Sequence, residues 1–298
     1  MMGYGKRKSS PTILKKLRWW LLHNGPRRHV TVNSKNGLIS FDSTDNCVGK
    51  HIFFQGEYDI DKVKNITSFL TDNGYVDADE PGTILNVGAN IGLMTTALKL
   101  YSVYDKVVAF EPVPSNYELL EINIKQNDMD KDVVCVNLAL SSEDGMIDME
   151  LSDENYGDHR VRRTNSNGAY GESKRKVVQV KMSRLDTFIN SYQKDIKIGL
   201  IFMDIQGHEY DFFIGAKDVI LRFEIPTVTE FWPYGLARAK IKRDDYYELI
   251  SSMYTHYYDA EDMIKKKIDE IFSLFDKYDN PNISTDIILV NENWKKSE

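Results

Sequence analysis

The sequence predicts an α/β fold with a mainly parallel sheet, helices on both of its faces, and a small N-terminal cap. Two features of the sequence predict this class. From about residue 58, short apolar runs alternate with helical stretches, and a turn with two glycines joins the first of these runs to a helix-like pattern. Parallel strands need crossover connections, and the helices that make the crossovers cover both faces of the sheet.

Composition and charge narrow the class of protein. The 298 residues are 42% hydrophobic and 28% charged, which is typical of a globular protein. The formal net charge of −7 argues against a general nucleic-acid binder, because neutralising phosphates requires clustered lysine and arginine. Cys47 and Cys135 show neither metal-ligand nor disulfide spacing, and no apolar run reaches about 18 residues. We therefore expect a cytoplasmic protein without a membrane-spanning helix.

Residues 1–56 are expected to form the cap and residues 57–298 the main domain. The cap begins with ILKKLRWWLLHNGPRR, which places apolar side chains on one helical face beside Lys15, Lys16 and Arg18. Packing of this face on the body or on a second subunit is the favoured interpretation, and contact with a membrane surface is the alternative. The segments HVTVNS and GLISFDS follow, and the pair Asn36-Gly37 between them predicts a β-hairpin.

The main domain opens with a helix near residues 61–73, and seven strands are expected after it. Their ranges are 83–87, 106–110, 133–136, 198–203, 226–230, 256–259 and 286–290. In open α/β sheets ligands bind at the carboxyl ends of the strands. Polar residues that directly follow these strands are therefore the candidates for a functional site.

The turn after the first strand reads GANIG and is bracketed by Gly88 and Gly92. Glycine permits positive φ and close approach of a ligand, and the first turn of the next helix offers unpaired N–H groups. We interpret this turn as a binding loop rather than a simple connection. A dinucleotide fingerprint would need glycine in place of Asn90 and glycine or alanine in place of Leu93.

A carboxylate ends the second strand, in the stretch VVAFEPVP. Glu111 can accept two hydrogen bonds from the vicinal hydroxyls of a ribose, and Pro112 ends the strand beside it. A lone carboxylate at a strand end is more often simply exposed. Together with the glycine loop, Glu111 predicts a nucleoside-binding site.

These stretches resemble those of the FkbM-type class I methyltransferases. The matching segments run in order across residues 83–233 and are ILNVGANIG, VVAFEPVPSNYELLEINIKQN, VNLALSSEDG, RLDTF, IFMDIQGHEYDFFIGA and TEFWP. The resemblance implies a Rossmann-like, seven-stranded methyltransferase sheet with S-adenosylmethionine (SAM) as cofactor. It also implies methyl transfer to a hydroxyl of a sugar, a glycan or a hydroxylated natural product.

The resemblance also implies which residues contact the cofactor. They are Asn86, Gly88, Ala89, Asn90, Gly92, Glu111, Pro112, Ala139, Leu140 and Asp204. Asn86 and Gln206 depart from the family pattern, which usually has aspartate and glutamate at these two positions. Asn86 can still accept hydrogen bonds and donate two, so a contact with the amino-acid moiety of SAM stays open.

Methyl transfer to a hydroxyl is helped by a group that takes the hydroxyl proton. Asp204 and His208 follow the fourth strand in MDIQGHEY, and His159 lies in the earlier stretch ENYGDHRVRR. We expect His208 or His159 to be the base, with an ordinary pKa of about 6.5. Asp204 is then the orienting or charge-stabilising group. The alternative for His208 is that it begins a helix capped by Glu209.

Side chains suited to a polyhydroxylated acceptor occur in two places. Asn155, Asp158 and Arg160 lie before the fourth strand, at the start of a locally basic region that extends to residue 176. Glu230 and Trp232 lie at the end of the fifth strand. A solvated loop is the alternative for the first group, and core packing is the alternative for Trp232.

Two other hypotheses stay open at this point. The chain could be another Rossmann-type nucleotide-binding enzyme, or a catalytically silent interaction protein with the SAM-binding fold. No cluster of histidine and cysteine predicts a zinc site, so we expect activity without a metal ion. The expected partners are the cofactor and a hydroxylated acceptor, with homo-oligomerisation also open.

Overall fold

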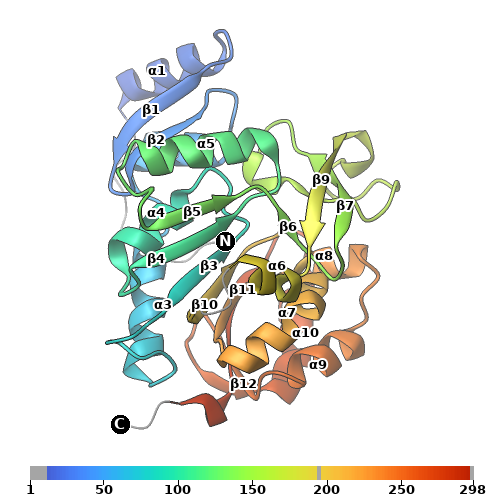
Figure 1. Ribbon diagram of the computed structural model, residues 1–298. Helices are drawn as coiled ribbons and strands as arrows, with labels where there is room; N and C mark the ends of the chain where they lie inside the picture. Colours follow the sequence, from blue (N-terminus) through green and yellow to red (C-terminus); the bar gives the residue numbers. More distant parts are fainter. Residues whose placement is uncertain (1–11, 193–195, 296–298) are drawn as a thin grey trace.

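The structure, a computed structural model, describes residues 12–192 and 196–295 (Figure 1). Its main sheet has eight strands. In order across the sheet they are β13 (Lys265–Lys267), β12 (His256–Asp259), β14 (Thr285–Val290), β11 (Thr227–Phe231), β10 (Ile198–Met203), β3 (Thr83–Val87), β4 (Lys106–Phe110) and β5 (Val133–Val136). The five strands from β5 to β11 run parallel, and β14 runs antiparallel to β11 and β12.

The seven predicted strands are confirmed, each to within one residue at either end. They were recognisable because parallel strands are buried on both faces and therefore read as nearly continuous apolar runs. All five residues of β3 are buried, for example. The eighth strand, β13, consists of three lysines at the edge of the sheet, a composition that gives no strand signal.

Helices cover both faces of this sheet, as predicted (Figure 1). Alternate residues of β3 face opposite ways: Leu85 and Val87 belong to one core cluster and Ile84 belongs to the other. The first cluster includes side chains of α6 (Leu185–Tyr192), α7 (Glu209–Phe223), α9 (Arg243–Ser251) and α10 (Phe272–Lys277). The second includes side chains of α3 (Ile60–Asp72), α4 (Leu93–Tyr101) and α5 (Pro114–Lys125).

A second sheet of four short strands was not predicted. Its order is β6 (Ala139–Leu140), β9 (Lys176–Ser183), β7 (Gly145–Leu151) and β8 (Arg160–Val161), and β7 pairs antiparallel with both β8 and β9. The sequence analysis treated residues 160–176 as a basic stretch, whereas the structure makes its start a strand and its end the beginning of β9. This small sheet holds the two loops that follow β7 and β8.

The N-terminal segment folds into α1 (Ile13–His23), the hairpin of β1 (His29–Ser34) and β2 (Gly37–Asp42), and α2 (Val48–Gln55). The hairpin is confirmed, with Lys35 and Asn36 between its strands and Gly37 at a φ of 97°. Asn36 is buried, and its amide donates to the carbonyl of Leu93 at the start of α4. The hairpin is therefore attached to the main sheet through α4.

The prediction that α1 packs its apolar stripe on the body is wrong. The side chains that the body buries come from the opposite face, where Trp19 packs on Phe41 and Phe53. Ile13, Leu14, Leu17, Trp20 and Leu21 are all exposed. Amphipathicity shows which residues form the apolar stripe, but it does not show whether the stripe faces the body or the solvent.

Buried Asn123 on α5 joins the hairpin to the glycine loop. Its side-chain oxygen accepts from the Ser40 N–H at 2.7 Å, and its amide donates to the Ser40 carbonyl at 2.9 Å and to the Ile91 carbonyl at 2.7 Å. Asn123→Ala leaves these three backbone groups without a partner in the interior. We expect it to lower the free energy of unfolding by about 2–4 kcal/mol in urea denaturation.

The matched control is Asn127→Ala, because Asn127 makes the same pair of bonds to the N–H and carbonyl of Leu38 near the surface. Water can replace those bonds, so we expect a loss below about 1 kcal/mol. Equal losses for the two variants would contradict the role assigned to Asn123.

Candidate active site

The glycine loop after β3 lies against the end of β10. Gly88 has a φ of 83°, and a Cβ atom on it would lie 1.9 Å from the Asp204 carbonyl oxygen. The N–H groups of Gly88 and Ala89 both donate to the carbonyl of Phe110 at the end of β4. No side chain fits at position 88, so glycine is required there by the neighbouring strand as well as by the turn.

Gly92 has a different role from the one predicted. It is the N-cap of α4 with a φ of 92°, and a Cβ atom on it would lie 2.8 Å from Leu120 on α5. Gly92 does not line the cleft described next. Its small size allows α4 and α5 to pack closely, so its contribution to cofactor binding is the placement of the loop.

A cleft opens at the carboxyl ends of β3, β4 and β10, and we call it the cofactor cleft. Among the residues that line it are nine of the ten predicted cofactor residues: Asn86, Gly88, Ala89, Asn90, Glu111, Pro112, Ala139, Leu140 and Asp204. The candidate bases His159 and His208 line it too. The structure therefore brings together residues from loops that are far apart in the sequence.

Glu111 is the buried carboxylate of this cleft. Its two side-chain oxygens accept from the N–H groups of Asn90 and Val113, each at 2.8 Å. Burial raises the pKa of Glu111 to about 7, although the two N–H donors oppose the shift. Each oxygen keeps a lone pair for one more donor, which is the pattern that two vicinal hydroxyls of a ribose would satisfy. Ala139 and Leu140 of β6 are buried and add apolar surface to the same cleft.

Asn86 uses its amide to join three elements. Its oxygen accepts from the Thr95 hydroxyl of α4 at 2.7 Å, and its nitrogen donates to the Phe202 carbonyl of β10 at 3.3 Å. One N–H of the amide remains for the cleft. Asn90 adopts a φ of 51°, and its side-chain oxygen accepts from the N–H of Ile91. Both asparagines therefore shape the loop, whatever they contribute to the cofactor.

Both histidines are poor bases in this environment. Burial, reinforced by the positive charge of Arg163, lowers the pKa of His208 to about 3. Its Nε2 pairs with the Ser141 hydroxyl at 3.0 Å, and its Nδ1 pairs with Arg163. Burial lowers the pKa of His159 to about 4, and its Nδ1 accepts from the N–H of Ser152. We therefore do not expect either histidine to titrate near its ordinary pKa, and the role of a histidine as base stays a prediction.

The backbone at His208 matches the alternative interpretation, in which His208 begins a helix that Glu209 caps. His208 is the N-cap of α7, and Glu209 accepts from the N–H groups of Ile205 and Gly207 in the turn before the helix. This turn includes Gln206 at a φ of 56° and Gly207 at 92°. It directs the side chains of Asp204 and Gln206 toward the cleft.

Three charged residues that the sequence did not suggest also line the cofactor cleft: Asp59, Lys62 and Asp286. Lys62 of α3 forms ion pairs with Asp286 at 2.7 Å and Asp59 at 3.1 Å, and Tyr58 lines the cleft beside them. Burial lowers the pKa of Lys62, but the two carboxylates outweigh it and raise the pKa overall. Lys62 on α3 and Asp286 on β14 (Thr285–Val290) meet only because the helix packs on the sheet, so no local pattern in the sequence could have linked them.

A second cavity, of about 520 Å³, adjoins the cofactor cleft, and we call it the acceptor cavity. All five predicted acceptor residues line it: Asn155, Asp158, Arg160, Glu230 and Trp232. Gln206 lines both cavities and marks the point where they meet. Ser284, part of a stretch that had suggested no role, lines the acceptor cavity as well.

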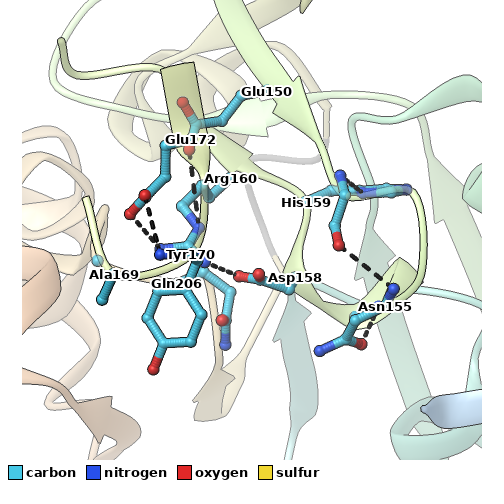
Figure 2. A network of polar contacts seen from close by, with 12 residues as sticks. Glu150, Asn155, Asp158, His159, Arg160, Ala169, Tyr170, Glu172 and Gln206 are labelled. Atoms are coloured by element: carbon cyan, nitrogen blue, oxygen red, sulfur yellow. Dashed lines mark hydrogen bonds and ion pairs between the residues drawn. The ribbon is translucent and has the colours of Figure 1, made fainter. Parts of the chain in front are cut away.

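A buried charge network forms one wall of the acceptor cavity (Figure 2). The Arg160 guanidinium pairs with Asp158 and lies 3.9 Å from Glu150 and 3.8 Å from Glu172. It also lies about 5 Å from the rings of Tyr170 and Trp232. Within the described residues, its Nε and one terminal nitrogen have no hydrogen-bond partner. Trp232 is thus both a buried packing residue and part of the cavity wall.

Two carboxylates meet where the cavities join. The amide nitrogen of Gln206 donates to Asp204 at 2.7 Å and to Glu230 at 3.2 Å, and the Ser284 hydroxyl donates to Glu230 at 2.7 Å. The Asp204 side chain is exposed to the cleft, and desolvation by the surrounding protein raises its pKa. Desolvation, together with the charge of Asp204, raises the pKa of Glu230 well above its ordinary value. Both groups are therefore better proton acceptors than an ordinary carboxylate.

A sheet in this order, with a glycine loop and a buried carboxylate at its carboxyl edge, defines a Rossmann-like nucleotide-binding fold. Residues 86–278 match the methyltransferase FkbM domain, so the chain belongs to the FkbM methyltransferase family. It is a SAM-dependent methyltransferase, as the sequence resemblance implied. The hypothesis of another Rossmann-type enzyme is wrong.

Curated relatives and a solved structure are similar to this chain. Methyltransferase sdnD of Sordaria araneosa is 28% identical over 191 residues, which cover 56% of this chain and 74% of that protein. Methyltransferase 1 of Beauveria bassiana (strain ARSEF 2860) is 23% identical over 177 residues, covering 56% and 67%. The crystal structure of Methyltransferase FkbM from Methylobacillus flagellatus KT is 12% identical, with a TM-score of 0.38, over 70% of this chain and 43% of that one. The similarity thus spans less than half of the solved chain.

Among the residues that the structure describes, no group of three or more histidine, cysteine, aspartate or glutamate side chains is arranged to hold a metal ion. Metal independence stays a prediction. Exhaustive chelation should leave activity unchanged, and a loss of activity that added Mg²⁺ restores would contradict it.

We expect Glu111→Ala to weaken SAM binding by about 1–3 kcal/mol, because ribose hydroxyls would lose their acceptor in a buried site. Isothermal titration calorimetry measures this change directly. Glu118→Ala removes an exposed carboxylate of α5 that lies outside the cleft, so it is the control and should bind SAM normally. Unchanged affinity in Glu111→Ala would contradict the assignment.

The raised pKa of Glu111 also predicts a pH dependence of SAM binding. The ionised carboxylate is the form that accepts two hydroxyl donors, so binding favours proton release and strengthens as the pH rises through about 7. We expect affinity at pH 8 to exceed that at pH 6 by about tenfold more in the wild type than in Glu111→Gln. Comparing the two proteins removes any titration of SAM itself. Parallel pH profiles would show that Glu111 does not titrate there.

Proposed function

We propose that this protein transfers the methyl group of SAM to a hydroxyl of a sugar, a glycan or a hydroxylated natural product. The observation that carries the proposal is the junction of the two cavities, where Asp204 and Glu230 lie on either side of Gln206. When bound, SAM supplies an electrophilic methyl group on a sulfonium. The chain's own residues must then hold the acceptor hydroxyl and receive its proton.

The acceptor cavity has the chemistry to hold a molecule with many hydroxyls. Asn155 and Asn282 present amides, Ser284 presents a hydroxyl and Lys174 an ammonium group, beside the aromatic wall of Trp232. Three guanidinium groups face three carboxylates in this network, so the wall that they form favours no particular charge on the ligand; the residues are Arg160, Arg175 and Arg238, and Glu150, Asp158 and Glu172. A cavity with mixed donors, acceptors and one aromatic surface suits a sugar or a similar polyol.

The carboxylates at the junction are better placed than the histidines to accept the proton. Desolvation raises the pKa of both Asp204 and Glu230, which increases their basicity when ionised, whereas it lowers the pKa of His159 and His208. Asp204 lines the cofactor cleft next to Gln206, which marks the junction with the acceptor cavity and donates a hydrogen bond to Asp204. We therefore assign the base to Asp204, with Glu230 beside it.

Asp204→Asn should lower kcat by about 10²- to 10⁴-fold, far more than it weakens SAM binding, because the amide cannot accept the proton. Transfer of labelled methyl from SAM to a panel of methyl glycosides, nucleotide sugars and polyphenols measures kcat, and calorimetry measures SAM affinity in parallel.

His159→Gln and His208→Gln are the matched controls, with an expected loss below about tenfold, and at saturating SAM the pH profile of kcat should be the same in both variants as in the wild type. A large, selective loss of kcat in one histidine variant would show that this histidine, and not Asp204, is the general base. No methyl transfer to any hydroxylated acceptor in the panel, with transfer to an amine or thiol instead, would overturn the O-methyltransferase proposal.

A further inference from the structure

Helix α1 presents an apolar surface that nothing in the described chain covers. Five side chains form it: Ile13, Leu14, Leu17, Trp20 and Leu21, each between 51% and 87% exposed. We call it the α1 outer face. In Figure 1 the helix lies at one end of the molecule, beyond the β1–β2 hairpin and away from the main sheet. Soluble proteins seldom expose so many large apolar side chains together without a partner for them.

The helix is held firmly by its other face, so the exposure is a fixed property of the fold. Trp19 is 7% exposed and packs on Phe41, Phe53 and Phe54, and Lys15 donates to the Phe54 carbonyl at 3.0 Å. At about 100° per residue, these inward positions lie opposite the centre of the α1 outer face. A helix anchored in this way cannot rotate its apolar stripe onto the body without losing the Trp19 contacts.

Positive charge borders the α1 outer face on both sides. By the same helical spacing, Lys16 lies next to one margin of the stripe and Arg18 lies next to the other, and both side chains are exposed. The first 41 residues carry nine of the chain's 38 lysines and arginines and none of its 45 acidic residues. Arg28, also exposed, lies in the turn between α1 and β1. The cap is therefore strongly basic on an otherwise acidic protein.

This charge pattern discriminates between occupants of the face. A second copy that docked its own α1 here would bring Lys16 and Arg18 against the same residues of the partner, with no acidic residue in the segment to offset the repulsion. An anionic lipid surface satisfies both features at once, because it accepts an apolar stripe below the headgroups and attracts the flanking cations. Trp20 belongs to the residue type that prefers this interfacial depth.

We propose that the α1 outer face docks the protein on the surface of an anionic lipid bilayer. The contact is peripheral, since no helix among the described residues has the length and apolar character to cross a membrane. Neither α1 nor the hairpin contributes a residue to the cofactor cleft or the acceptor cavity. Lipid docking and methyl transfer therefore rest on separate residues, and each can be tested without the other.

The test is co-sedimentation of the full chain with vesicles, either of phosphatidylcholine alone or of equal parts phosphatidylcholine and phosphatidylglycerol. We expect binding to the mixed vesicles to exceed binding to the neutral ones by about tenfold or more, and to weaken as salt is added. Leu17→Glu/Leu21→Glu should reduce binding to the mixed vesicles by about tenfold or more. Lys16→Glu/Arg18→Glu should abolish the preference for anionic lipid.

The matched control is Leu100→Glu/Leu221→Glu, which adds the same two negative charges at exposed leucines of α4 and α7. It should bind vesicles like the wild type, and SAM binding confirms that every variant is folded. The proposal is overturned if the wild type ignores anionic vesicles, or if the control loses as much binding as the α1 variants. It is also overturned if the protein without lipid is a dimer that Leu17→Glu/Leu21→Glu dissociates, since that result assigns the face to a second copy.

Discussion

The contact between Gly88 and the end of β10 is the constraint on which the rest of the site depends. With a Cβ position only 1.9 Å from the Asp204 carbonyl, the glycine loop can pass across the sheet edge only because position 88 has no side chain. The N–H of Asp204 also donates to the Val87 carbonyl, so the ends of β3 and β10 are held together on both sides of the contact. The loop that faces the cofactor and the strand end that carries Asp204 therefore have one fixed spacing, and Glu111 is fixed to the same loop through the N–H of Asn90.

Burial then decides which groups at this edge can exchange protons. The same desolvation raises the pKa of Glu111 and Glu230 and lowers that of His159 and His208, because it penalises whichever form of a group is charged. A site assembled in this way contains neutral histidines and unusually basic carboxylates. Asp204, whose side chain stays open to the cleft, is then the group to which we assign the proton-accepting role in our proposal. The histidines keep a structural part, since His208 begins α7 and its ring joins Ser141 to Arg163.

The features that short stretches of the sequence encode could be predicted from it. The strands of the main sheet were visible as apolar runs, the glycine loop and Glu111 as residues that follow strands, and the acceptor residues as polar groups in two loops. Prediction failed where a property arises only from assembly. The charge state of His208 depends on packing, the pairing of Lys62 with Asp286 depends on how α3 packs on the sheet, and the direction of the α1 outer face depends on the packing of Trp19. The small sheet escaped notice because β6 and β8 have only two residues each and β9 carries charged residues at exposed positions.

The two departures from the family pattern have a common physical explanation in this structure. Each places an amide where the family usually has an acid, and each amide donates a hydrogen bond that a carboxylate could not. Asn86 donates to the Phe202 carbonyl while it accepts from Thr95, and Gln206 donates to both Asp204 and Glu230. Glutamate at position 206 would instead place a third negative charge between two carboxylates that are already costly to ionise. The hypothesis of a catalytically silent protein rested on interpreting these two positions as decay, and the bonds that they make argue for a site whose polar groups are mutually adapted.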